Sequence, residues 1–223
     1  MKKELDAEVN EVMPEFKLVV SVPKHNNQSI KVKVVGDEKI QLSKEQKEGR
    51  KLPIAIVSRA LADKLNVNDA VLMLKFSQEG GKVIKMHFKT TIEDGLDENT
   101  VKISSDLLGE KIGELQAEAI AMKSKAFQLT LDDSTSRRFV GMKIGDEIDA
   151  VIIDLKGKLV VKGGSDNSGF PMRKDLPGAV KKKLLLSGPP GYHPERNGEK
   201  RRKMVRGNTI DESFVQINTI LVQ

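Results

Sequence analysis

Apolar and polar residues alternate with a period of two in many short stretches of this chain, and this pattern predicts β-strands with one buried face. The predicted strands lie in both halves of the sequence: residues 16–21, 30–34, 54–57, 70–76, 82–88, 127–131, 147–155, 158–162, 182–186, 203–205 and 215–221. Gly80-Gly81 between two of them is typical of a hairpin turn. Because helical patterns are scarce and the strands are short, we expect a mainly β fold. It should consist of small β-barrel units with a few short helices and a basic, loop-rich C-terminal part.

A weak internal repeat marks the two clearest helix starts. Val57-Ser58-x-x-Leu61 resembles Ile103-Ser104-x-x-Leu107, and in each the serine is placed to cap a short helix after a strand. The first of these helices is predicted to cover residues 59–65. The repeat is consistent with a barrel built from related halves, and equally with ordinary strand-to-helix turns.

Alternation restarts from Lys125, and we therefore place a domain boundary near Ser124. Residues 1–12 then form a polar N-terminal extension, with Met13 as a second possible start. Residues 13–124 form one barrel-like, β-rich domain. Residues 125–223 form a second, which contains the basic segment 162–206 and a closing strand.

The chain lacks the residues that several classes of site require. The chain has no cysteine, so disulfides and thiolate zinc sites are excluded. Its three histidines, His25, His87 and His193, are far apart in sequence and belong to no catalytic motif, and His87 fits a structural place inside an apolar strand. No window is apolar enough for a membrane span, and the first residues lack the apolar core of a signal peptide. We therefore expect a cytoplasmic protein that is not an enzyme and needs no cofactor or metal.

Residues 184–191, LLLSGPPG, superficially resemble a strand that enters a nucleotide-binding phosphate loop. Such a loop requires a second Gly, a Lys and a Ser or Thr at positions that here hold His193, Pro194 and Glu195. Proline also removes backbone N–H donors from the segment. This feature is therefore predicted to be a rigid turn, which makes a nucleotide-dependent enzyme the least favoured class.

Positive charge is concentrated in one segment. Residues 162–206 hold twelve Lys or Arg and four Asp or Glu, a net charge of +8, whereas the whole chain carries +6. The other 178 residues therefore carry −2. Charge gathered in this way is typical of a protein that binds a polyanion such as a nucleic acid.

Two features of the basic segment suggest how it binds. Gly163, Gly164 and Gly169 are interpreted as a loop whose backbone approaches a phosphate closely, with Arg173 and Lys174 completing the contact, although a flexible surface turn is the alternative. Residues 196–203, RNGEKRRK, combine an Asn-Gly turn with a basic cluster between two strands, which predicts a hairpin that orients its guanidinium groups.

The same segment resembles one protein family. Residues 163–172 (GGSDNSGFPM), 183–187 (KLLLS) and 197–207 (NGEKRRKMVRG) match in order and spacing the signature of number six of the small-subunit ribosomal proteins, archaeal and eukaryotic type. The resemblance covers about residue 127 to the C-terminus. The GPPG variant at 188–191 and the GNTI ending at 207–210 resemble archaeal members. Residues 13–124 resemble the extended form of certain archaeal members.

The resemblance implies a structural constituent of the small ribosomal subunit with a role in translation. Its partners would be ribosomal RNA and neighbouring ribosomal proteins, with no membrane and no small-molecule substrate. The alternative is a free RNA-binding, translation-associated regulatory factor with residues 13–124 as an adaptor domain. In both cases the expected RNA-binding residues are Lys162, Gly163, Gly164, Ser165, Gly169, Phe170, Met172, Arg173, Lys174, Lys181, Lys182, Lys183, Tyr192, His193, Arg196, Lys200, Arg201, Arg202, Lys203, Arg206 and Asn208.

Overall fold

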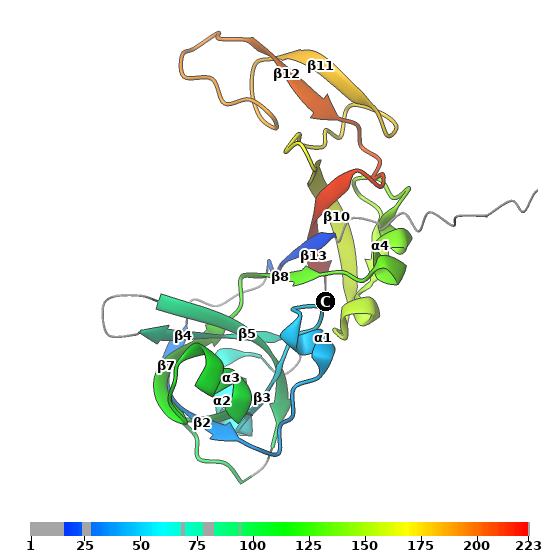
Figure 1. Ribbon diagram of the computed structural model, residues 1–223. Coiled ribbons are helices and arrows are strands. Elements are labelled where there is room, and N and C mark those ends of the chain that lie inside the picture. Colours follow the sequence, from blue (N-terminus) through cyan, green and yellow to red (C-terminus); the bar gives the residue numbers. More distant parts are fainter. Residues whose placement is uncertain (1–15, 24–27, 68–69, 78–82, 94, 223) are drawn as a thin grey trace, which may run out of the picture.

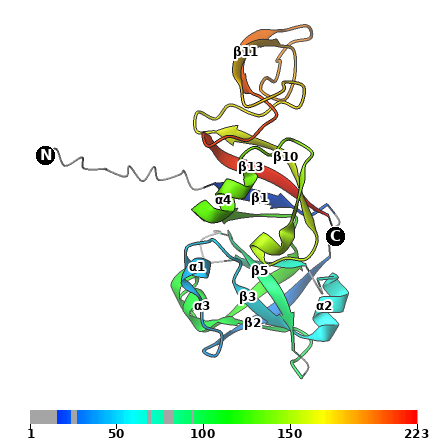
Figure 2. The same ribbon diagram turned by 90° about the vertical axis from the view of Figure 1, so that its right-hand side faces the viewer.

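The computed structural model describes residues 16–23, 28–67, 70–77, 83–93 and 95–222. Over these residues the strands form a closed six-stranded barrel, a five-stranded sheet and a two-stranded hairpin. The sheet lies between the other two, so the molecule is elongated with the barrel at one end and the hairpin at the other (Figures 1 and 2). The predicted fold class, mainly β with a small barrel and short helices, is confirmed. The predicted extension 1–12 and the turn at Gly80-Gly81 lie outside the described residues.

The barrel closes through neighbouring strands in the order β2 (Ser29–Asp37), β6 (Thr100–Ser104), β3 (Ile54–Val57), β5 (Val83–Ile92), β4 (Val71–Ser77) and β7 (Gln116–Lys123). Three short helices accompany it: α1 (Lys44–Lys47), α2 (Arg59–Leu65) and α3 (Ser105–Lys111). Apolar residues from alternate positions of the strands and from α2 and α3 fill the interior, with Leu61, Leu72, Phe88 and Ile103 fully buried. The alternation seen in the sequence is thus the inward face of a closed barrel.

The strand pairing of the barrel is symmetric between its two halves. The first half is β2, β3, α2 and β4, and the second is β5, β6, α3 and β7. β2 runs parallel to β6 and antiparallel to β7, while β5 runs parallel to β3 and antiparallel to β4. Exchanging the halves therefore leaves the pairing unchanged, and this favours related halves as the origin of the sequence repeat. Ser58 accepts a hydrogen bond from the Leu61 amide at 3.3 Å, whereas Ser104 caps α3 without such a bond.

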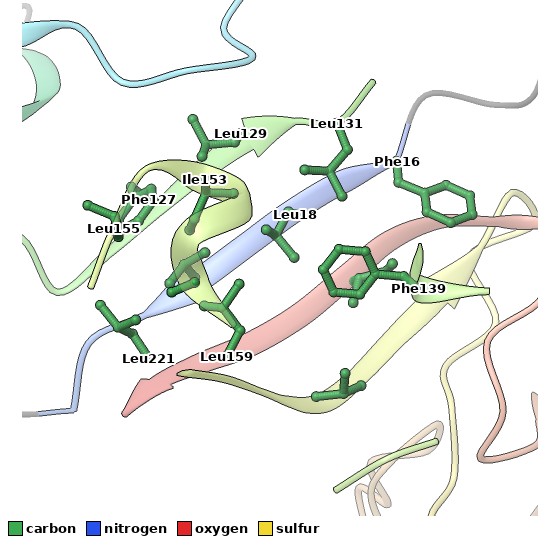
Figure 3. Close-up of a cluster of buried hydrophobic side chains, with 14 of the residues drawn as sticks. Phe16, Leu18, Phe127, Leu129, Leu131, Phe139, Ile153, Leu155, Leu159 and Leu221 are labelled. Carbon is green, nitrogen blue, oxygen red and sulfur yellow. The ribbon is translucent and has the colours of Figure 1, made fainter. Parts of the chain in front are cut away.

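The five-stranded sheet has the order β8 (Ala126–Thr130), β1 (Lys17–Ser21), β13 (Phe214–Val222), β10 (Lys158–Asp166) and β9 (Glu147–Asp149). The helix α4 (Asp133–Phe139) and the 3-10 helix η1 (Ala150–Ile153) cover one face. Figure 3 shows Leu18 of β1, Leu159 of β10 and Phe139 of α4 in the resulting apolar cluster, and all three are fully buried. This second unit is an open sheet, whereas the sequence predicted a second barrel.

Strand β1 corrects the domain boundary expected at residue 13. It pairs with β8 on one side and β13 on the other, so residues 17–21 belong to the five-stranded sheet. The amide of Val22 donates to the carbonyl of Lys125 at 2.8 Å, which extends the antiparallel pairing of β1 with β8. The barrel is therefore inserted into the connection of a β1–β8 hairpin.

One predicted strand was also wrong for most of its length. Residues 147–155 form only the short strand β9 before the chain turns into η1, which buries Ala150 and Ile153 at helical rather than alternating spacing. The charged stretch 43–50 contains α1, which is stabilised by a capping box between Ser43 and Gln46.

His87 of β5 lies where the barrel meets the sheet. Its Nδ1 is 3.0 Å from Ser124 Oγ, and its ring centroid is 6.4 Å from that of Phe127 in β8. Burial, with a smaller contribution from the neighbouring Lys85, lowers the pKa of His87 below its ordinary value of 6.5. These contacts agree with the structural role that the sequence predicted for His87.

The lowered pKa predicts a pH-dependent stability. Below pH 6.5 the unfolded chain binds a proton at His87 more readily than the folded chain does. Stability is therefore lost as pH falls through 6.5 toward the lower pKa of the folded state. The slope contributed by one such group is at most about 1.4 kcal/mol per pH unit. Urea unfolding of a His87→Gln variant should show a weaker pH dependence than the wild type between about pH 7.5 and 5.5. His193→Gln, at an exposed position, is the control and should keep the wild-type dependence.

Candidate RNA interface

The basic segment is built around a hairpin of β11 (Lys181–Leu186) and β12 (Arg201–Arg206), joined by residues 187–200. The pair projects from the end of the five-stranded sheet farthest from the barrel (Figure 1). The predicted hairpin is therefore present, and its strands and connecting loop carry nine exposed basic residues: Lys181, Lys182, Lys183, Arg196, Lys200, Arg201, Arg202, Lys203 and His193.

The two faces of the hairpin differ. On one face, Leu186 and Val205 are buried with Tyr192, which the connecting loop folds back over the strands. The opposite face carries Lys183, Leu185 and Arg202, with Leu185 and Arg202 directly opposite each other in the register. Leu185 is 60% exposed. The small apolar cluster fixes the hairpin, so its other face presents cations on a rigid support.

The connecting loop is anchored to the rest of the chain. Arg173 donates through both Nε and Nη2 to the Asp175 carboxylate at 2.9 Å, and through Nη1 to the carbonyl of Pro190 at 3.3 Å. Gly198 has a φ of 82°, as expected for the turn that the Asn-Gly sequence predicted. This turn lies within the loop, where the Glu199 amide donates to the Arg196 carbonyl, and does not join the strands directly.

The expected glycine loop is a strand for most of its length. Gly163 and Gly164 lie in β10 and pair with β13, so the loop expected at these two glycines is a strand. The turn comes later, where Asp166 Oδ1 accepts hydrogen bonds from the amides of Ser168 at 3.0 Å and Phe170 at 2.8 Å. Gly169 ends this turn with a φ of 79°.

Gly164 is required for packing inside the protein. A Cβ at this position would lie 2.5 Å from the backbone oxygen of Gln216 in β13, whereas a Cβ on Gly163 would meet nothing within 4 Å. The close approach that a glycine permits is thus between two strands of the sheet.

We expect Gly164→Ala to destabilise the fold by about 2 kcal/mol or more, because the adjacent strand must move away. Gly163→Ala, one residue earlier in the same strand, should change the free energy of unfolding by less than about 1 kcal/mol. Denaturant unfolding of both variants measures the difference. Similar losses at the two positions would contradict a steric role that is specific to Gly164.

Four expected RNA-binding residues are buried: Gly164, Met172, Tyr192 and Arg206. Arg206 is 7% exposed, donates to Asp211 and to Ser213 Oγ at 2.8 Å, and stacks over the Phe214 ring at 5.3 Å. Its Nε also lies 3.9 Å from the carboxylate of buried Asp166. Arg206 therefore stabilises the junction of hairpin and sheet, and its positive charge is directed into the protein.

The remaining expected residues lie near the base of the hairpin. Lys162 and Lys174 are exposed, and Ser165 is half-buried in β10. Phe170 is half-buried with the Lys181 ammonium 4.7 Å above its ring, so this aromatic face is already covered. Asn208 Oδ1 accepts a hydrogen bond from the amide of Gly178 at 3.0 Å, so its side chain stabilises the local backbone.

Three of the four acidic residues of the segment, Asp166, Asp175 and Glu199, are engaged locally. Arg173 lowers the pKa of Asp175 through their paired hydrogen bonds, and Glu199 pairs with Arg201 at 2.8 Å. Burial, followed by the nearby Glu199 carboxylate, raises the pKa of Tyr192. Asp166 is buried beside Arg206, as described above. The exposed lysines and arginines of the hairpin therefore dominate its surface charge.

One exposed basic residue near the hairpin, Lys143, was not among the residues expected from the sequence. This exposed residue forms an isolated β-bridge with Thr209, just after β12, and so lies at the base of the hairpin. It is far from the basic segment in sequence, and only the three-dimensional pairing identifies it.

Other kinds of site are not formed by the described part of the chain. Its His, Cys, Asp and Glu residues make no group of three or more that could hold a metal ion. None of its helices is both long and apolar enough to cross a membrane.

Comparison with known proteins assigns the chain to a family. The family model described as Ribosomal protein S6e matches residues 116–223. Small ribosomal subunit protein eS6 of Hyperthermus butylicus is 45% identical over 213 residues, which cover 94% of this chain and 98% of that protein. The eS6 proteins of Staphylothermus marinus and Saccharolobus solfataricus are 43% and 44% identical, cover 94% and 95% of this chain, and are matched over 99% and 100% of their own lengths. These matches extend through the barrel as well as the sheet and hairpin. The chain belongs to the S6e family of ribosomal proteins.

Proposed function

We propose that this protein is a structural constituent of the small ribosomal subunit and binds ribosomal RNA through the exposed Lys and Arg side chains of the β11–β12 hairpin and its loop. The observation that carries the proposal is the gathering of exposed Lys and Arg side chains on a hairpin that projects from the sheet. The small-subunit names of its relatives support the ribosomal setting.

The chemistry of the hairpin suits a phosphate backbone. Lys183 and Arg202 lie on the face opposite the apolar cluster of the hairpin. Lys182 and Lys203 lie on the other face but are also exposed, so the four charges are spaced along a rigid support. Such contacts neutralise phosphates and release counterions, whichever bases are present. Recognition of the correct RNA then rests on its folded shape and its 2′-hydroxyl groups.

The barrel has a different surface. Residues 28–123 contain 16 Lys or Arg and 15 Asp or Glu, so their charge is nearly balanced. A surface of mixed charge suits neighbouring ribosomal proteins better than it suits an RNA backbone. We therefore assign RNA binding to the hairpin end of the molecule and contacts with proteins to the barrel end.

Sedimentation of a cell extract tests the ribosomal role. The protein should move with the small subunit through a density gradient and stay bound after a wash at moderate salt. Recovery in the soluble fraction at the top of the gradient would instead support a free RNA-binding, translation-associated factor, with the barrel as its adaptor.

A further inference from the structure

A hollow of about 670 Å3 lies where the hairpin loop meets the sheet. Its lining comes from four separate segments: Ile144 and Gly145 before β9, Val161 and Lys162 of β10, the stretch containing Met172, Lys174 and Asp175, and Pro190 of the hairpin loop. Its volume falls within the roughly 300–1,000 Å3 that is usual for small-ligand sites. It is continuous with the proposed RNA interface.

The walls of the hollow are held by hydrogen bonds within the protein. The amide of Ile144 donates to Asn208 at 2.9 Å, and that of Gly145 donates to Val161 at 2.8 Å. The Met172 amide donates to the Gly164 carbonyl at 3.0 Å. On the opposite side, Arg173 ties Pro190 in place. The hollow is therefore formed before any ligand binds, and a ligand need not pay the ordering cost of its walls.

The chemistry of the hollow changes from its wall to its rim. Val161 and Met172 are buried and Ile144 is half-buried, so together with Pro190 they provide an apolar wall. Lys162 and Lys174 are exposed and form no ion pair with any described residue. Asp175 adds little opposing charge, because both of its carboxylate oxygens are bound by Arg173.

We propose that this hollow receives one unpaired, extruded nucleotide of the bound RNA, with its base against the apolar wall and its flanking phosphates on Lys162 and Lys174. Folded RNA is recognised with sequence or site specificity mainly through such splayed-out bases. An acidic peptide fits less well, because the lysines lie at the rim and the described residues of the apolar wall are uncharged. The inference rests on the proposed function and adds a position-specific contact to it.

A second cavity, on the barrel, does not share this chemistry. It is lined by Lys31, Lys33, Glu114 and Glu118 among others, so its charges are balanced. A polyanion gains little there, and we assign it no nucleotide.

Three RNA hairpins with the same stem test the inference on the full chain: one fully paired, one with a single bulged adenosine, and one with an abasic residue at the bulge. At one fixed salt concentration, the wild-type protein should bind the bulged RNA at least about fivefold more tightly than either of the others. Ile144→Trp should fill the hollow and remove this preference while keeping affinity for the paired RNA. Val151→Trp, at an exposed residue outside the lining, is the control and should keep the preference.

Ile144→Ala provides a second variant in case the tryptophan perturbs folding, and it should weaken the preference without filling the hollow. Equal affinity of the wild type for all three RNAs, with a normal dependence on salt, would overturn the inference and leave the proposed function intact. Failure to bind any of the three would overturn the proposed function, and the inference with it.

Discussion

Removal of six exposed charges from the hairpin is expected to abolish most RNA affinity without unfolding the protein. The six residues are Lys182, Lys183, Arg196, Lys200, Arg202 and Lys203, and none forms an ion pair with a described residue. If about six phosphates are neutralised, log affinity of the wild type should fall with log salt at a slope of about −4 to −6. Replacing all six with Ser should bring this slope close to about −1 and lower affinity at least about 100-fold near physiological salt.

A matched variant separates this effect from the loss of net charge. Lys31, Lys33, Lys39, Lys44, Lys47 and Lys85 are exposed on the barrel, and replacing them with Ser removes the same six charges. This variant should keep nearly all of the affinity and the salt slope, measured by fluorescence anisotropy on one small-subunit RNA fragment. Equal losses in the two variants would show that the binding depends on overall charge and not on the hairpin.

Deletion of the barrel is expected to have opposite results depending on whether β1 is kept. β1 lies between β8 and β13, and its residues Leu18 and Val20 are completely buried, as is Phe16 just before it. Removing buried side chains of this size costs about 2–5 kcal/mol each, a sum comparable with the whole stability of a domain. The fragment 125–223 should therefore fail to fold.

A chain that keeps residues 16–22 should fold without the barrel. Val22 and Lys125 are already hydrogen-bonded across the β1–β8 pair, so an Asn-Gly turn can replace residues 23–124. Circular dichroism and thermal unfolding should show a cooperative transition for this chain and none for 125–223. Its stability should be below that of the full protein, because Leu52 and Val71 of the deleted region pack against the same core. A folded 125–223 fragment, or an unfolded joined chain, would contradict the insertion of the barrel into this hairpin.

The strands were predictable because their buried faces repeat every second residue. Residues 16–21 and 215–221 both show this alternation, and both are strands in the structure. Their mutual pairing was not predictable, because Lys17 opposite Gln216 joins positions about 200 residues apart with no local signal. The predicted domain boundary was therefore wrong at β1, although the barrel itself was predicted.

The basic hairpin was also predictable, because charge and turn residues are local properties of the sequence. The roles of Gly164 and Arg206 were not. Glycine is rare in strands, so a Gly-Gly pair indicates a loop unless the approaching strand is known. Arg206 resembles its basic neighbours in sequence, but it is the last residue of β12, beside the five-stranded sheet, where it contacts Asp166, Asp211 and Phe214 and is buried.

The most direct test of the account is ultraviolet crosslinking of this chain within intact small subunits, followed by mass spectrometry of the RNA-linked peptides. Crosslinks are expected on β11, β12 and the loop 187–200 between them, with residues at the base of the hairpin such as Lys143 and Lys174 also close to RNA. Crosslinks confined to the barrel strands, with none between residues 181 and 206, would contradict RNA binding by the hairpin.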